Sequence, residues 1–280
     1  MDRFVASPES LTSMHLFRFW SSGDFEVLID GKLVAITCSA GSNISQEHAE
    51  AQCAVKAEHV QNLIDGTVER DNSYERPVKE EIIEEIDDHN IVTRNRYGSL
   101  ILNSCSLNIF DIDDYKHSFW ESLGFGGKKD TKAAIIANLR KLFEKLDQRN
   151  NGWRIYETCK GIRLIVLGEY LDPRSSAFEQ FSREINADSL YALLCAKQNC
   201  YRARLTPKPH RLHLERLKFV CPLPEDIEGR YEQWLEEYQQ QSKNYAVCRL
   251  AEVLGDSSNE NPIVAFHDRV CRSDTSLQLA

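Results

Sequence analysis

Two aspartates, Asp111 and Asp113, stand one residue apart at the end of an apolar segment over residues 107–110. The segment is typical of a β-strand, in which side chains two residues apart point to the same face. Two carboxylates on one face repel each other, and a divalent cation that also binds phosphate oxygens is a common partner for such a pair. An acidic turn at the end of the strand is the alternative, because Asp114 follows and the chain is acidic. The other segments of the chain are needed to choose between a metal site and an acidic turn.

A predicted hairpin over residues 153–167 carries a second group of residues suited to chemistry. Around its turn, Thr158, Lys160, Gly161 and Arg163 combine a hydroxyl, two cations and a glycine that lets a ligand approach the backbone. Such a combination of donors suits phosphate oxygens. An exposed turn with two solvated cations is the alternative interpretation.

The most basic part of the chain is residues 197–218, with seven Lys or Arg and one acidic residue. Arg202 and Arg204 share a face of the strand predicted over residues 199–206, and guanidinium groups suit phosphate or carboxylate oxygens. The ring of Tyr201 is suited to stacking on a base. The arginines could equally neutralise carboxylates of the protein itself, the two aspartates of the first segment included.

Further basic residues lie on both sides of this strand. Lys208 and Arg211 follow it, and Arg94 and Arg96 form a basic loop before the first predicted core strand. The phosphate-binding residues predicted in this way are Thr158, Lys160, Gly161, Arg202, Arg204 and Lys208. The residues predicted to contact nucleic acid are Arg94, Arg96, Tyr201 and Arg211.

Together these segments resemble the archaeo-eukaryotic primase superfamily, which includes the primase-polymerases. The first motif of that superfamily is an apolar strand that ends in Asp-x-Asp, as at Asp111 and Asp113. The second lies on a later hairpin and often reads Thr-x-x-Gly-x-His. Thr158, Gly161 and Arg163 fall in its register, so an arginine stands where relatives have a nucleotide-binding histidine.

Two weaker matches extend the resemblance over residues 95–270. Some relatives have an Asn-Phe-Arg strand with a following lysine, which Tyr201-Arg202 and Lys208 resemble, and Asp268 is the candidate for the third acidic position. His267-Asp268 is by itself a candidate metal-ligand pair, with a surface hydrogen bond as the alternative.

The resemblance implies a metal-dependent nucleotidyltransferase of the primase-polymerase type. Asp111, Asp113 and Asp268 would hold Mg²⁺ or Mn²⁺ and align a primer hydroxyl with a nucleoside triphosphate, with Asp111, Asp113 and Arg163 as catalytic residues. Arginine does not readily exchange a proton, so a second interpretation stays open. It is a catalytically degenerate module that binds nucleotide or single-stranded nucleic acid.

Charge separates the chain into two parts. The net charge of the 280 residues is −9. Residues 1–90 hold 7 Lys/Arg against 18 Asp/Glu, whereas residues 91–280 hold 27 against 25. A third hypothesis is therefore an accessory protein that contacts a protein partner through its acidic N-terminal module.

No part of the sequence predicts secretion or a membrane span. No window holds the roughly 20 apolar residues that a span needs, and the N-terminus lacks an apolar core. The nine cysteines include no Cys-x-x-Cys pair and several lie in apolar patterns, which favours buried thiols. We expect a cytoplasmic protein.

The periodicity of the chain predicts an α+β fold with a mainly antiparallel sheet. Residues 91–280 follow the order ββ-α-ββ-α-β, a primase- or RRM-like core that includes a hairpin over residues 99–113. Residues 1–90 form an α+β appendage with a hairpin that turns at Asp30-Gly31, a helix capped by Ser45 and a second helix that begins at Pro77.

Overall fold

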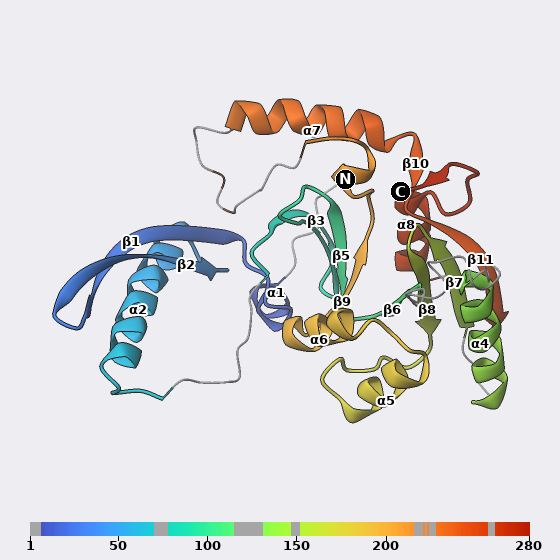
Figure 1. Ribbon diagram of the computed structural model, residues 1–280, viewed down its shortest axis with the longest axis horizontal. Helices are drawn as coiled ribbons and strands as arrows, with labels where there is room; N and C mark the ends of the chain where they lie inside the picture. The colour runs from blue at the N-terminus through green and yellow to red at the C-terminus, as the bar shows by residue number, and fades with distance from the viewer. Residues whose placement is uncertain are drawn as a thin grey trace, which may run out of the picture.

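The chain has the α+β class and the mostly antiparallel pairing that the sequence predicts. The computed structural model describes residues 7–69, 78–114, 131–146, 152–215, 221, 223, 228–256 and 261–280. Two four-stranded sheets stand next to each other, and a long hairpin with one helix forms a further layer at the left of Figure 1. Over residues 100–204 the described elements follow the predicted order ββ-α-ββ-α-β, with a pair of helices at the second α position, but their strands divide between two sheets.

The first sheet has the strand order β3-β4-β5-β9, with each neighbouring pair antiparallel. Its last strand is the predicted arginine strand, in which alternate residues are buried. Arg202 and Arg204 therefore share a face, as predicted. The strands are β3 (Glu81–Asp87), β4 (Asn90–Arg94), β5 (Leu100–Ser104) and β9 (Tyr201–Arg204).

The second sheet has the order β11-β7-β8-β6, again antiparallel throughout. The predicted hairpin over residues 153–167 forms its centre, and β8 is buried along its whole length. The strands are β6 (Asn108–Asp113), β7 (Gly152–Thr158), β8 (Gly161–Leu167) and β11 (Cys248–Gly255).

The predicted hairpin over residues 99–113 is wrong, because its two strands belong to different sheets. β5 pairs with β4 and β9, and β6 pairs with β8. Residues 105–107 between them include no Gly, Pro, Asn or Asp, and the Ser104 hydroxyl accepts the N–H groups of Ser106 and Leu107 where the chain leaves β5. Both strands are buried for most of their length, so each finds partners elsewhere.

The N-terminal hairpin and its helix follow the sequence closely. β1 (Phe19–Ile29) and β2 (Lys32–Ser42) turn at Asp30 and Gly31, whose φ angles of 49° and 77° are those of a turn that suits Asp-Gly. The Ser45 hydroxyl caps α2 (Gln46–Ile64) by accepting the N–H of His48.

The second N-terminal helix is wrong, because its residues form strand β3. Pro77 itself lies outside the described residues. Val78, Ile82 and Ile86 have helical spacing, but Ile82 and Ile86 are equally compatible with a strand, and pairing with β4 decides the outcome. The predicted domain boundary at residue 90 falls inside this β3–β4 hairpin.

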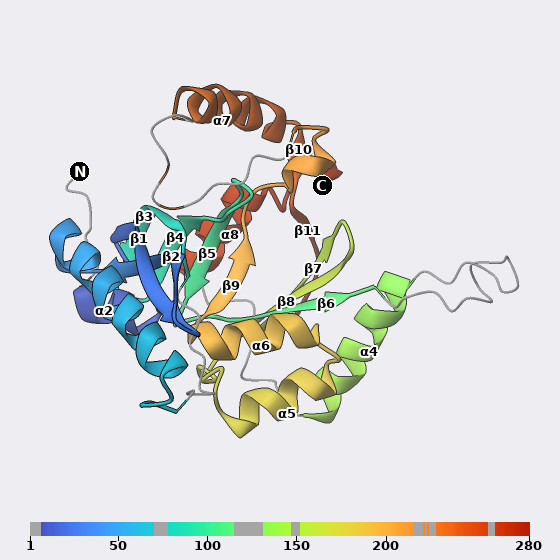
Figure 2. The same ribbon diagram turned by 60° about the vertical axis from the view of Figure 1, so that its left-hand side comes forward.

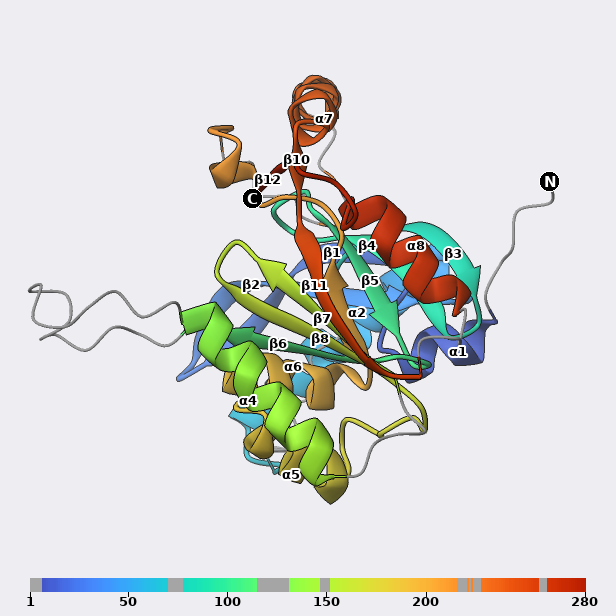
Figure 3. The same cartoon turned by 90° about the vertical axis from the view of Figure 1, so that its right-hand side faces the viewer.

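Helices pack against the second sheet. Figure 2 shows α4, α5 and α6 on one side of β6 and β8, whereas Figure 3 shows α8 beside β11. The Ser175 hydroxyl caps α5, and the Asp188 carboxylate caps α6. The sequence did not indicate α8. The remaining elements are α1 (Pro8–Ser13), α4 (Thr131–Lys145), α5 (Ser176–Glu184), α6 (Ser189–Gln198), η1 (Pro209–Arg211), α7 (Glu228–Ser242), β10 (Tyr245–Ala246), α8 (Pro262–Cys271) and β12 (Gln278–Leu279).

Candidate functional site

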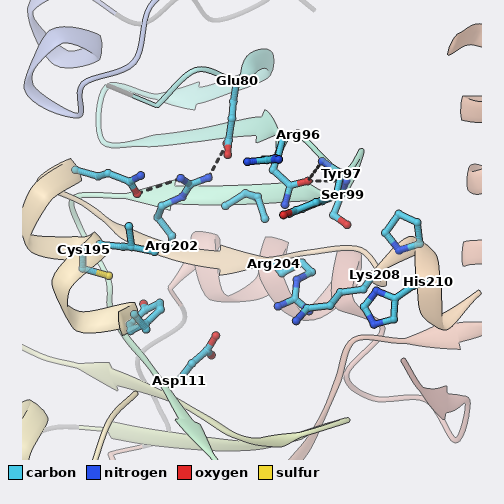
Figure 4. A pocket seen from close by; sticks show the side chains of 16 residues that line it. Glu80, Arg96, Tyr97, Ser99, Asp111, Cys195, Arg202, Arg204, Lys208 and His210 are labelled. Carbon is cyan, nitrogen blue, oxygen red and sulfur yellow. Dashed lines mark hydrogen bonds and ion pairs between the residues drawn. The ribbon is translucent and has the colours of Figure 1, made fainter. Parts of the chain in front are cut away.

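A pocket of about 530 Å³ opens where the two sheets meet. Strand β9 of the first sheet contributes two arginines, and β6 of the second contributes an aspartate on the facing side (Figure 4). Five of the residues predicted for the site line this pocket: Arg96, Asp111, Arg202, Arg204 and Lys208. The fold therefore brings together segments that are separated by more than a hundred residues.

Arg202 is neutralised within the protein. Its Nη2 lies 2.6 Å from Oε2 of Glu80, and its Nη1 donates to Gln198 Oε1 at 3.0 Å. Thr93 donates to the same Glu80 oxygen. The alternative that an arginine neutralises one of the protein's own carboxylates therefore holds for Arg202, although the carboxylate is Glu80 and neither aspartate of β6.

Arg204 and Lys208 have no such partner among the described residues. Within the described part of the chain, neither side chain donates a hydrogen bond to the protein or pairs with a carboxylate. Burial lowers the pKa of Arg204 to about 10, and the charges of Arg163 and Arg211 add to this effect against the opposing charge of Asp111. Burial, with Arg204 and Arg211, also lowers the pKa of Lys208. The pocket thus holds uncompensated positive charge.

Arg163 lies beneath the pocket and holds Asp111. Its side chain is 2% exposed, and its Nε donates to Asp111 Oδ1 at 3.0 Å. Its Nη1 donates to the Arg204 carbonyl oxygen at 3.0 Å and lies 3.1 Å from His267 Nε2. Burial disfavours the charge of Arg163, but Asp111, together with the nearby Cys248 and Cys271, more than offsets this, and the pKa of Arg163 is held above its ordinary value. A buried residue in these contacts positions Asp111 and does not line the pocket.

Asp113 has different surroundings from Asp111. It is exposed and does not line the pocket, and it stands opposite Gly161 in the β6–β8 pairing. Burial, followed by the charges of Asp188 and Asp111, raises its pKa. The two aspartates share one strand face, but an arginine neutralises only one of them.

Asp268, the predicted third acidic residue, is engaged elsewhere. Its Oδ2 accepts from Arg154 Nη2 at 2.7 Å, and its Oδ1 lies 2.9 Å from His267 Nδ1. It does not line the pocket that Asp111 lines. In the described residues Asp268 is linked to Asp111 through His267 and Arg163, and both of its oxygens have partners.

The predicted phosphate-binding turn lies at the end of β6, outside the pocket lining. The Thr158 carbonyl accepts from Lys132, and the Lys160 carbonyl accepts the N–H of Asp114. At Gly161, which has a φ of 153°, a Cβ atom would overlap the carbonyl oxygen of Ile112. The structure therefore explains this glycine by the close approach of β6.

Gly161→Ala is expected to lower the free energy of unfolding by about 3 kcal/mol, since it adds backbone strain and a steric overlap. Gly31→Ala is the matched control, because Gly31 also has a positive φ but has open space around it. We expect a loss of about 1 kcal/mol for the control in urea denaturation. Equal losses for the two variants would contradict the packing explanation.

The predicted nucleic-acid contacts fall in three different environments. Tyr201 is fully buried, donates to the Leu171 carbonyl at 2.9 Å and packs against Phe110, so the prediction that it stacks on a base is wrong. Arg94 pairs with Glu81 at 3.4 Å in a smaller neighbouring pocket. Arg211, in η1, acts on the site through its charge, as described above for Arg204 and Lys208.

Sequence reasoning missed Glu80 and Tyr97. Glu80 opens an acidic segment that resembled a helix, and only the pairing of distant strands reveals its contact with Arg202. Tyr97, with 46% of its surface exposed, lines the pocket beside Arg96, whose guanidinium lies 5.1 Å from the ring centre. An exposed aromatic residue within a basic loop is the signal that could have identified it.

Comparison with known proteins gives no relative. No protein-family model, no curated protein and no solved structure matches the chain. None of the helices in the described ranges is long and apolar enough to cross a membrane.

Proposed function

We propose that the chain binds a phosphate-bearing ligand, a nucleotide or single-stranded nucleic acid, in the pocket between the two sheets. The observation that carries this proposal is the pair of largely buried cations, Arg204 and Lys208, that have no carboxylate partner in the described residues. Burying like charges together is unfavourable unless an anion neutralises them. Phosphate oxygens supply that charge and accept several hydrogen bonds from a guanidinium.

The size and lining of the pocket support a ligand with a base attached to its phosphate. A volume of about 530 Å³ lies within the usual range for small-molecule sites. The lining also includes Tyr97, Ile101 and Leu194, whose apolar groups suit a ring system, whereas the cations suit the phosphate. Tyr97 takes the stacking role in this proposal.

The binding proposal is tested with Arg204→Ala and with Arg183→Ala as the control, because Arg183 is an exposed arginine paired only with Glu179 on its own helix. We expect Arg204→Ala to weaken nucleoside triphosphate or oligonucleotide binding by about 30-fold, the loss of one charged hydrogen-bonding group. Arg183→Ala should bind as the wild type does. Calorimetric titration at two salt concentrations measures both.

The same variants exclude loss of folding as an explanation. Arg204 has no side-chain partner to lose among the described residues, and its buried charge is unfavourable, so Arg204→Ala should keep or raise the melting temperature of the free protein. Unchanged affinity in Arg204→Ala would overturn the proposed site, and a lowered melting temperature would show that Arg204 has a structural role.

A second candidate function is metal-dependent nucleotidyl transfer. Burial, followed by the charges of Asp188 and Asp111, raises the pKa of Asp113 at the end of β6, and Mg²⁺ or Mn²⁺ would favour its ionised form. The ion pair of Asp111 with Arg163 favours binding without catalysis. Product formation from primed template, nucleoside triphosphate and Mn²⁺ that Asp113→Asn abolishes would favour the enzyme.

A further inference from the structure

A second group of reactive side chains lies behind Arg163, outside the pocket. Cys248 on β11 and His267 and Cys271 on α8 are fully buried, and their candidate ligand atoms lie within 4.8 Å of one another. His267 and Cys271 are four residues apart, so both project from the same face of α8. Figure 3 shows that this helix lies beside β11, which explains how residues far apart in sequence converge.

The histidine is oriented as a metal ligand would be. Its Nδ1 lies 2.9 Å from Asp268 Oδ1, and Asp268 is held in turn by Arg154 at 2.7 Å. A carboxylate that accepts from Nδ1 leaves Nε2 with its lone pair, and metal-bound histidines commonly have such a carboxylate partner. The Asp268–His267 contact, which is buried on the histidine side, is therefore more than a surface hydrogen bond.

We propose that Cys248, His267 and Cys271 bind a zinc ion that fastens α8 to the second sheet. Two thiolates and an imidazole are the ligand types that select zinc, whereas Mg²⁺ and Mn²⁺ prefer oxygen ligands. Two thiolates also balance the charge of the ion, which suits a fully buried site. The fourth ligand of the zinc ion would be a water molecule or the Arg204 carbonyl oxygen, which lies 3.7 Å from Cys271 Sγ.

Arg163 adapts to the ion without losing its function. Its Nη1 lies 3.1 Å from His267 Nε2, the nitrogen that would bind zinc. Its contact with Asp111 is made by Nε, whereas its contact with the Arg204 carbonyl is made by the same Nη1. Zinc would therefore displace Nη1 from His267 and leave the ion pair of Nε with Asp111 in place.

The test measures zinc in the full-length chain produced in zinc-supplemented medium. We expect one equivalent in the wild type, and at least about tenfold less in Cys271→Ser and Cys248→Ser. Cys195→Ser is the control, because Cys195 is equally buried but lies on α6, outside the cluster. Equal zinc in Cys271→Ser and Cys195→Ser would overturn the proposal.

Because the serine variants can fail to fold, cobalt gives a readout on the wild type itself. Refolding with Co²⁺ is expected to produce thiolate-to-cobalt charge transfer in the near ultraviolet and the strong visible bands of a tetrahedral ion. A wild type with neither zinc nor these bands overturns the site. A metal-free chain that is lighter by two hydrogens, and so carries a Cys248–Cys271 disulfide, overturns it as well.

Discussion

Asp111→Asn is expected to lower the free energy of unfolding by about 3 kcal/mol at neutral pH, although it removes one of two neighbouring negative charges. The reason is Arg163, which is 2% exposed and has Asp111 as its only carboxylate partner in the described residues. An asparagine oxygen can still accept the hydrogen bond, but the buried guanidinium loses its counter-charge. Urea denaturation at pH 7 measures the loss.

Asp113→Asn is the matched comparison, and we expect it to increase stability at neutral pH. The raised pKa of Asp113 means that the folded state holds this proton at higher pH than the unfolded state does. The protonated Asp113 carboxyl stabilises the fold below the pKa that this group has in the unfolded chain. This stabilisation is lost as the pH rises through the pKa of Asp113 in the folded protein. Asp113→Asn should therefore raise the melting temperature at pH 7 and change it little at pH 3.

An exposed aspartate away from the site serves as the control. Asp274→Asn should leave stability unchanged at both pH values, because Asp274 is exposed. If Asp111→Asn stabilised the chain as Asp113→Asn does, the two carboxylates would be equivalent and the ion pair with Arg163 would be unimportant. Arg163→Met combined with Asp111→Asn should recover part of the lost stability, because the double variant has no charged group at positions 111 and 163.

Tyr201→Ala is expected to cost about 4 kcal/mol of unfolding free energy, as large-to-small changes of core aromatic residues do. The ring is fully buried against Phe110, Tyr170 and Phe178. Tyr201→Phe keeps this packing and removes the hydroxyl that donates to Leu171, so we expect a loss of about 1 kcal/mol.

Affinity for nucleotide or oligonucleotide distinguishes this role from base stacking. Tyr201→Phe should bind as the wild type does, because no part of the ring reaches the pocket surface. Thermal melts and the titration used for Arg204→Ala measure both properties. A Tyr201→Ala protein that kept its stability but lost affinity would restore the stacking role.

Local signals of the sequence predicted the elements that depend on local chemistry. Alternation around Asp30-Gly31, the hydroxyl of Ser45 and the apolar hairpin over residues 153–167 each specify their own geometry. The shared face of Arg202 and Arg204 also follows from strand periodicity alone. The class of the fold and the position of the basic strand could be predicted for this reason.

The partners of these elements could not be predicted in the same way. A strand pattern does not say which strand it pairs with, so β5 and β6 appeared as one hairpin. Which arginine is neutralised depends on Glu80, which precedes Arg202 by 122 residues. The free cations of the pocket are therefore a property of the tertiary structure.

The single side chain of Arg163 joins four elements: from β8 it reaches Asp111 on β6, the Arg204 carbonyl on β9 and His267 on α8. A guanidinium has five N–H groups for such contacts, whereas a histidine ring has two nitrogen atoms and could serve at most two of the three partners. Exchange of Arg163 for histidine would leave Asp111 or the Arg204 carbonyl without its donor. A change at position 111 alone or at position 163 alone therefore gives a less stable protein. We expect the two positions to change together.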